Sequence, residues 1–106
     1  MKVYLINKNF EVNAIGEFDP KSNALIVLKG SLLSKDIVYT PKFKGSKAIE
    51  KHRKGRVKNC ILQEDVAFKS SSTAGNFVTG RSTNGPAVWK DEKGRTIKEI
   101  FLEKEA

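Results

Sequence analysis

The sequence is poor in the residues that form covalent crosslinks and metal sites. Among its 106 residues there is one cysteine, Cys60, and one histidine, His52. A single thiol forms no internal disulfide, so we expect a protein of a reducing compartment, the cytoplasm. A zinc site needs about four N, S or O ligands, usually in close pairs, and the sequence has no such pairs of Cys and His. We therefore expect no metal and no cofactor.

Long apolar runs are also missing. No stretch approaches the roughly 18 consecutive apolar residues that predict a membrane span. The apolar run at residues 3–6 is followed at once by Asn7, Lys8 and Asn9, so it is too short for a signal peptide. The hydrophobic fraction of 39% nevertheless suffices for a globular core. We expect one domain over residues 1–106 that contacts no membrane.

Acidic residues are scarce in one part of the chain, and the excess of positive charge lies there. The net charge is +8, and residues 35–60 carry nine Lys or Arg against two acids. Residues 1–34 carry four against three, and residues 61–106 carry seven against seven. Concentrated basic charge is typical of proteins that bind a polyanion. The alternative is a solvated surface that keeps a small domain soluble.

The first third of the sequence predicts strands. One short strand is expected at 3–6, and two more at 11–18 and 24–28, joined by the turn cluster 19–23 into an antiparallel hairpin. Gly16 within a strand pattern indicates a bulge or a close backbone approach. We expect the core to include Val12, Ile15, Phe18, Leu25, Ile26 and Val27.

A basic helix is expected at 46–54, with Ser46 as its N-cap. Lys47, Lys51, Lys54 and Lys58 are spaced by four, three and four residues, so a continuous helix would present them along one face. Gly55 could instead end the helix early and leave Lys58 in the following segment.

A second helix is expected at 71–79. The serines and threonine at 70–73 are candidates for its N-cap, and Ala74, Phe77 and Val78 follow the i, i+3, i+4 pattern of one helix face. Gly80 stands where a left-handed C-cap residue is wanted. The serines either only cap this helix or bind an anion such as a phosphate at its positive end.

The C-terminal part predicts a second hairpin near 86–101. Residues 82–86 have the composition of a turn, residues 87–90 begin a strand, and residues 91–94 form a tight turn. Residues 95–102 return as a strand or finish as a helix. Trp89 is expected to anchor the core, the alternative being a platform for an exposed base. The predicted fold is therefore α+β, a small antiparallel sheet made of the N-terminal and C-terminal hairpins, with two short helices between them that cover one face.

Residues 65–100 contain F-K-S-S-S-T-A-G, then G-R-S-T-N-G, then W-K. This run closely resembles a bacterial domain-of-unknown-function family, commonly found C-terminal to GIY-YIG nuclease domains, with the pattern F-x-S-P-S-A-A-A, G-x-S-x-N-G and W-K. The family is similar to the RAMA domain associated with restriction enzymes and adenine methylases. The resemblance covers about residues 14–101. Ser71 stands in place of the family's usual Pro, and Thr73 and Gly75 replace two of its alanines.

The resemblance implies an association with DNA-processing systems, in which RAMA-like domains have been proposed to sense modified DNA. It supplies no catalytic residues. Together with the charge distribution, it leads us to expect a non-catalytic nucleic-acid-binding domain, with DNA as the ligand. The alternative is a protein-interaction or regulatory module that acts with a nuclease or methyltransferase in trans. An enzyme would need a pocket with convergent titratable groups, which the sequence does not display.

Two groups of residues are expected to contact the nucleic acid. The phosphate contacts are assigned to Lys42, Lys44, Lys47, Lys51, Arg53, Lys54, Arg56 and Lys58. Phosphate contacts position a ligand without specifying it, so readout of bases or their modification is assigned to a second patch. This second patch comprises Ser70, Ser71, Ser72, Arg81, Asn84 and Lys90.

Overall fold

The computed structural model describes residues 1–105 of the chain. In that part of the chain, no helix is long and apolar enough to cross a membrane. The elements in chain order are β1 (Lys2–Asn7), β2 (Val12–Phe18), β3 (Leu25–Val27), α1 (Ser46–Arg53), β4 (Val57–Lys58), β5 (Ile61–Leu62), β6 (Val66–Phe68), α2 (Ser71–Thr79), α3 (Gly85–Val88) and α4 (Ile97–Glu105).

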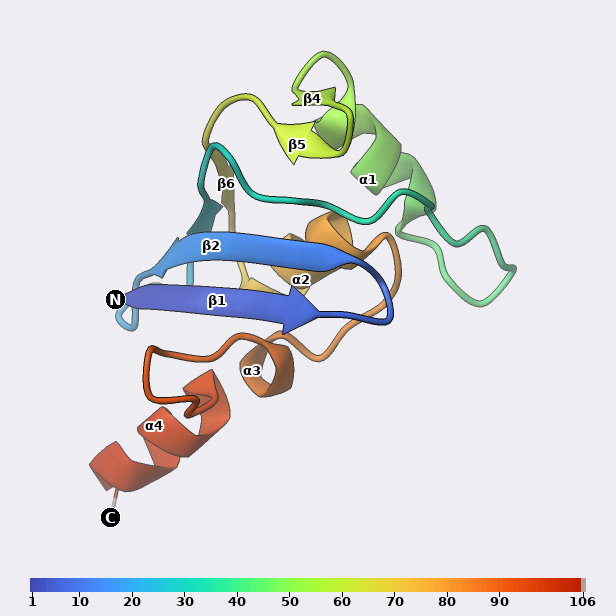
Figure 1. Ribbon diagram of the computed structural model, residues 1–106. Coiled ribbons are helices and arrows are strands. Elements are labelled where there is room, and N and C mark those ends of the chain that lie inside the picture. The colour runs from blue at the N-terminus through green and yellow to red at the C-terminus, as the bar shows by residue number, and fades with distance from the viewer. Residues whose placement is uncertain (106) are drawn as a thin grey trace.

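A four-stranded antiparallel sheet forms the centre of the molecule (Figure 1). Its strand order is β1-β2-β3-β6, and β4 and β5 form a separate two-stranded ribbon. Tyr4 lies opposite Ile15 in the first pair, and Ile26 lies opposite Ala67 in the last. The predicted hairpin over 11–18 and 24–28 is confirmed as β2 and β3, and the predicted first strand as β1.

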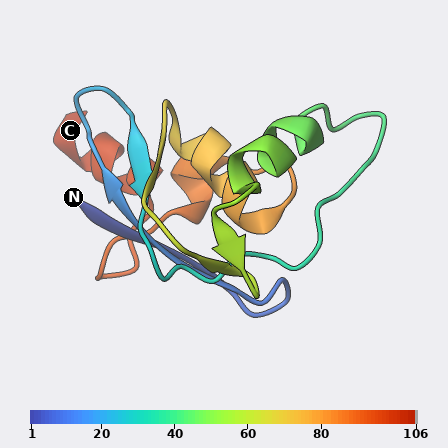
Figure 2. The same cartoon turned by 90° about the horizontal axis from the view of Figure 1, so that it is seen from above.

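One face of the sheet is covered by α2, which contacts β2, β3 and β6. The helix α1 contacts α2 in turn, and both helices lie on the same side of β1 and β2 when the molecule is seen from above (Figure 2). The α+β class, with a small antiparallel sheet and a few short helices, is therefore confirmed.

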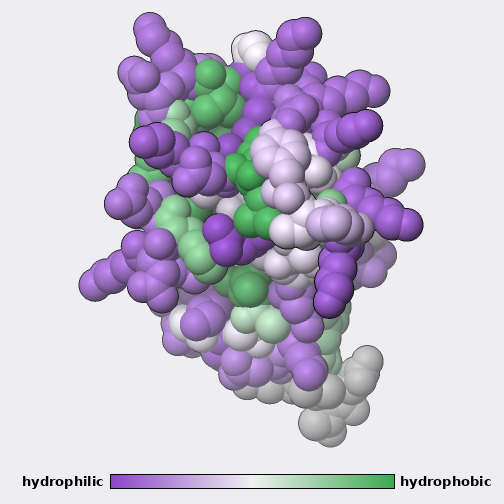
Figure 3. Space-filling view, turned by 90° about the vertical axis from the view of Figure 1, so that its right-hand side faces the viewer, coloured by the Kyte–Doolittle hydropathy of each residue, from purple (hydrophilic) through white to green (hydrophobic). Residues whose placement is uncertain are grey.

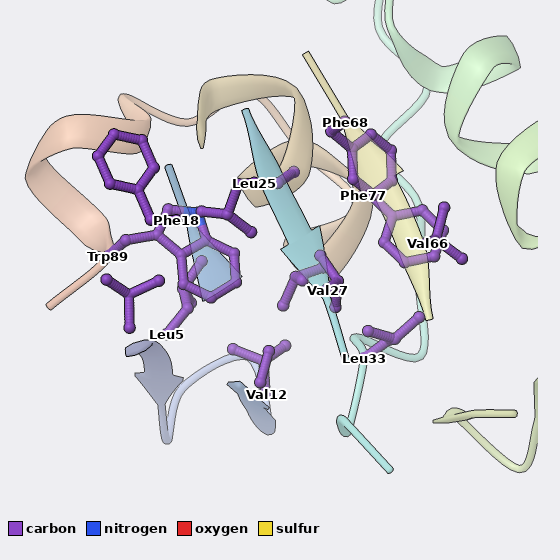
Figure 4. Close-up of a cluster of buried hydrophobic side chains, with 14 of the residues drawn as sticks. Leu5, Val12, Phe18, Leu25, Val27, Leu33, Val66, Phe68, Phe77 and Trp89 are labelled. Carbon is purple, nitrogen blue, oxygen red and sulfur yellow. The ribbon is translucent and has the colours of Figure 1, made fainter. Parts of the chain in front are cut away.

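The core lies between this covered face and α2 (Figure 4). Burial alternates strictly along β2, so that Val12 and Phe18 point into the core while Ile15 points away from it. The expectation that Ile15 and Ile26 are core residues is wrong, because they are 37% and 39% exposed on the uncovered face of the sheet. A strand with one covered face buries only every second residue.

Trp89 is fully buried, which confirms its expected place in the core. Its indole Nε1–H donates to the backbone oxygen of Ser71 at 3.0 Å, so the polar end of the ring is also satisfied. Gly16 makes room nearby, since a Cβ there would lie 2.8 Å from Leu25 Cδ2 and 3.4 Å from the Trp89 ring. The close backbone approach expected at Gly16 is confirmed, because the same Cβ would lie 3.2 Å from the Ile26 carbonyl oxygen.

The helix α2 has the bounds and caps that the sequence predicted. Ser70 is extended, and its Oγ accepts from the Thr73 backbone N–H at 3.1 Å. Gly80 ends the helix in the left-handed conformation with a φ of 72°.

The predicted C-terminal hairpin is wrong. Residues Gly85–Val88 form the short helix α3, and α4 begins at Ile97. Between the described residues of the two expected strands, 87–90 and 95–102, the strand pairing is limited to one bridge, which joins Lys90 and Thr96. Two local signals favour the helices: Pro86 occupies the first turn of α3, and Thr96 and Glu99 form a reciprocal capping box at the start of α4.

Candidate nucleic-acid interface

All six lysines assigned to phosphate contacts are exposed, and we call them the lysine cluster: Lys42, Lys44, Lys47, Lys51, Lys54 and Lys58. No ammonium group of the cluster forms an ion pair with a carboxylate in the part of the chain that the structure describes. Their charge is therefore available to a ligand. Figure 3 shows the side of the molecule on which α1 and the preceding loop lie, where hydrophilic side chains project around the upper half.

The helix α1 carries the middle of the lysine cluster. It begins at Ser46 and has Gly45 as its N-cap, so the sequence placed this cap one residue too late. It ends at Arg53, followed by Gly55 with a φ of 76°. Lys58 accordingly lies on β4, as expected if Gly55 ends the helix early. The cations in the last turn of α1 interact favourably with the negative end of its dipole.

Arg53 is turned inward. Its Nη2 and Nε donate to the Phe77 carbonyl oxygen at 2.7 and 3.1 Å, and its Nη1 donates to the Ser34 carbonyl oxygen at 2.8 Å. Burial lowers the pKa of Arg53 below its ordinary value. The guanidinium thus binds carbonyl groups of the last turn of α2, and Arg53 is not part of the lysine cluster.

Three further contacts link this region internally. Arg56 donates to the carbonyl oxygen of His52 at 3.1 Å, and its Nε lies 3.5 Å from Glu64 Oε1. The Tyr39 hydroxyl donates to the Glu50 carboxylate, which raises the pKa of Tyr39. Arg56 is partly neutralised by its acidic neighbour, so it offers less charge to a ligand than the lysine cluster does.

The three serines of the second patch have structural partners. Ser70 caps α2, and the Ser71 residue is buried while its carbonyl oxygen accepts from Trp89. Ser72 Oγ accepts from the Gly85 backbone N–H at 3.0 Å. The serines therefore cap α2 and attach α3 to its first turn. This is the simpler of the two roles that the sequence allowed.

Arg81, Asn84 and Lys90 lie in different surroundings. The Arg81 guanidinium lies 3.9 Å from the centre of the Phe10 ring, a cation–π contact. Asn84 is the exposed N-cap residue of α3. Lys90 has an exposed side chain and pairs through its backbone with Tyr4. The structure brings Ser72 next to Asn84 through the bond of Ser72 to Gly85, whereas Arg81 and Lys90 line two different hollows that share Phe10.

A groove of about 700 Å³ beside β1 was not predicted from the sequence. Lys90 is one of its lining residues, together with Tyr4, Ile6, Phe10 and Val88. The groove depends on how the residues around Lys90 cross the edge of β1. The one relevant signal in the sequence is the alternation of side-chain direction along a strand, which places Tyr4 and Ile6 on the opposite face from Val3 and Leu5.

Among the side chains that the structure describes, no group of three or more His, Cys, Asp or Glu is placed to hold a metal ion. His52 Nδ1 lies 2.7 Å from the Ala48 carbonyl oxygen, and the His52 ring packs 5.2 Å from the Phe68 ring.

Comparison with known proteins identifies the family but adds no relative of known activity. The family described as Domain of unknown function (DUF4357) matches residues 4–101. Neither the curated proteins nor the solved structures that were compared with the chain gave a match. Since the match extends over nearly the whole chain, this protein belongs to the family of the Domain of unknown function (DUF4357).

Proposed function

We propose that this protein is a non-catalytic domain that binds duplex DNA through the lysine cluster. The observation that carries the proposal is the concentration of six exposed lysines in residues 42–58, with no carboxylate partner among the described side chains. Lysines placed near phosphates release the counterions condensed on DNA, which drives binding without reading sequence.

The proposed setting is a restriction, modification or nuclease system of the bacterial cytoplasm. It rests on the resemblance of the stretch around Ser70 and Trp89 to domains found beside GIY-YIG nucleases and to RAMA domains. The chain would then bring DNA to a catalytic partner that acts in trans. Readout of a modified base would fall to the exposed side chains of the second patch, Asn84 and Lys90.

Fluorescence anisotropy with a short labelled duplex tests the proposal. If about six phosphates are contacted, the affinity falls about 10³-fold between about 50 and about 200 mM salt. Absence of binding at the lower salt concentration would overturn the proposal. The same titration with an adenine-methylated duplex tests the recognition of a modified base. Tighter binding of the methylated duplex supports this recognition. Equal binding of both duplexes contradicts it but does not contradict the phosphate contacts.

A further inference from the structure

The outer edge of β1, opposite β2, is only partly paired. The Tyr4 N–H donates to the Lys90 carbonyl oxygen at 2.7 Å, and the Lys90 N–H donates to that of Tyr4 at 2.9 Å. Ile6 lies two residues further along β1 and so directs its backbone groups toward the same edge.

The pairing of β2 agrees with this orientation. Asn13 lies opposite Ile6, yet both of its backbone groups bind Leu32, at 3.0 and 2.9 Å. The pair of Ile6 and Asn13 is therefore a non-hydrogen-bonded pair of the antiparallel ladder. Among the described residues, the N–H and C=O of Ile6 have no partner. They form an open position of the sheet edge.

The groove described above lies along this open position, where α3 runs beside β1 (Figure 1). One wall of the groove is the edge of β1, and Ala87 and Val88 of α3 form the opposite wall. Phe10 is a further lining residue, and the Ile6 side chain is 62% exposed. The groove thus combines a group of apolar side chains with one unpaired donor and one unpaired acceptor.

We propose that this groove binds an extended segment of a partner polypeptide, added as a short strand at Ile6. In an extended chain, every second residue directs both its N–H and its C=O toward the same edge. One such residue can therefore pair with the N–H and C=O that Ile6 leaves unpaired. Lys90 already pairs with Tyr4 in this way. An aliphatic side chain of the segment would then lie between Phe10 and Val88.

The charges near the groove favour an acidic segment. Lys90 lines the groove and Lys8 follows the end of β1, and both side chains are exposed. Asp91 and Glu92 also line the groove, but the Asp91 carboxylate is already bound by Arg95 at 2.9 Å. Glu92 also lines a hollow beside Met1 and Lys2, at the other end of β1 from Ile6. A partner that complements Lys8 and Lys90 carries acidic residues beside its aliphatic one.

The test uses Ile6→Pro and the control Ile6→Val. Proline at position 6 removes the N–H that points away from β2 and leaves every hydrogen bond between β1 and β2 in place. Edge strands tolerate proline at such a position. Valine keeps the N–H and the β-branched side chain. The probe is a fluorescein-labelled peptide with capped ends that alternates glutamate and valine. We expect Ile6→Pro to weaken binding about tenfold, the equivalent of one hydrogen bond of about 1.4 kcal/mol, and Ile6→Val to bind as the wild type does.

Amide NMR of the wild-type protein gives a second readout that does not depend on the folding of the proline variant. We expect the peptide to shift the Ile6 amide signal and to slow its hydrogen exchange. The proposal is overturned if no peptide binds, or if the shifts are confined to the lysine cluster. It is also overturned if single-stranded DNA protects the Ile6 amide and the peptide does not. None of these outcomes bears on duplex binding by the lysine cluster.

Discussion

The guanidinium of Arg53 joins the end of α1 to the last turn of α2, because its Nη2 donates to the Phe77 carbonyl oxygen at 2.7 Å. A helix ends with carbonyl groups that have no partner in the helix, and a cation placed there satisfies them and opposes the dipole. The same guanidinium reaches Ser34 in the preceding loop. Unlike the exposed lysine cluster beside it, Arg53 therefore acts on stability.

We predict that Arg53→Gln lowers the free energy of unfolding by about 2 kcal/mol, since hydrogen bonds to the last turn of α2 lose their charged donor. Its affinity for DNA should stay within about threefold of the wild type at fixed salt. The neighbouring Lys54→Gln is the matched control. It should weaken DNA binding and leave stability within about 0.5 kcal/mol. Thermal unfolding and anisotropy on both variants measure the two effects, and the opposite pattern would place Arg53 in the interface.

A second prediction concerns Gly75, which lies inside α2. Alanine there would raise helix propensity by about 1 kcal/mol, but its Cβ would clash with Thr83 Oγ1. Such overpacking costs about 1 to 3 kcal/mol, so we expect Gly75→Ala to lower the melting temperature. In a double-mutant cycle with Thr83→Ala, the second substitution should partly restore stability. A higher melting temperature for Gly75→Ala alone would contradict the close packing.

The elements fixed by local chemistry were predictable from the sequence. The Ser70 cap, the Gly80 terminus and the apolar face between them define α2 without reference to any other segment. The sequence contains only a weaker signal that the Arg53 side chain points toward the interior. Arg53 lies four residues after the buried Ile49, on the same side of α1, which was a sign of contact with the interior.

Features that depend on pairing between distant segments were not predictable. The expected strand around Trp89 is reduced to the backbone bridges of Lys90 with Tyr4 and with Thr96, because Gly85 and Pro86 begin a helical turn just before it. The open position at Ile6 requires knowledge of where Lys90 crosses the edge of β1. The capping box of Thr96 and Glu99, in contrast, is a local pattern visible in the sequence, and it favours a helix over a strand after Thr96.

The pH dependence of stability should depend in part on Asp91. Burial by itself would raise the pKa of Asp91, but hydrogen bonds from the backbone and guanidinium of Arg95 outweigh it and hold the pKa below the ordinary 3.8. This stabilisation is present above the pKa of the unfolded chain and is lost as the pH falls through the lower pKa of the folded state. We expect Asp91→Asn to lower the melting temperature at neutral pH. Its melting temperature should also fall less than that of the wild type as the pH drops below about 3.8. Parallel curves would contradict this role.

The most direct test of DNA binding by the lysine cluster is anisotropy on the triple variant Lys51→Glu, Lys54→Glu and Lys58→Glu. Its control reverses three exposed lysines outside the cluster, Lys21, Lys93 and Lys98, and so has the same net charge of +2 in place of +8. We predict that the first variant no longer binds duplex DNA while its melting temperature stays close to that of the wild type. The control should retain most of the affinity. Equal losses in the two variants, or retained binding by the first, would contradict a localised interface.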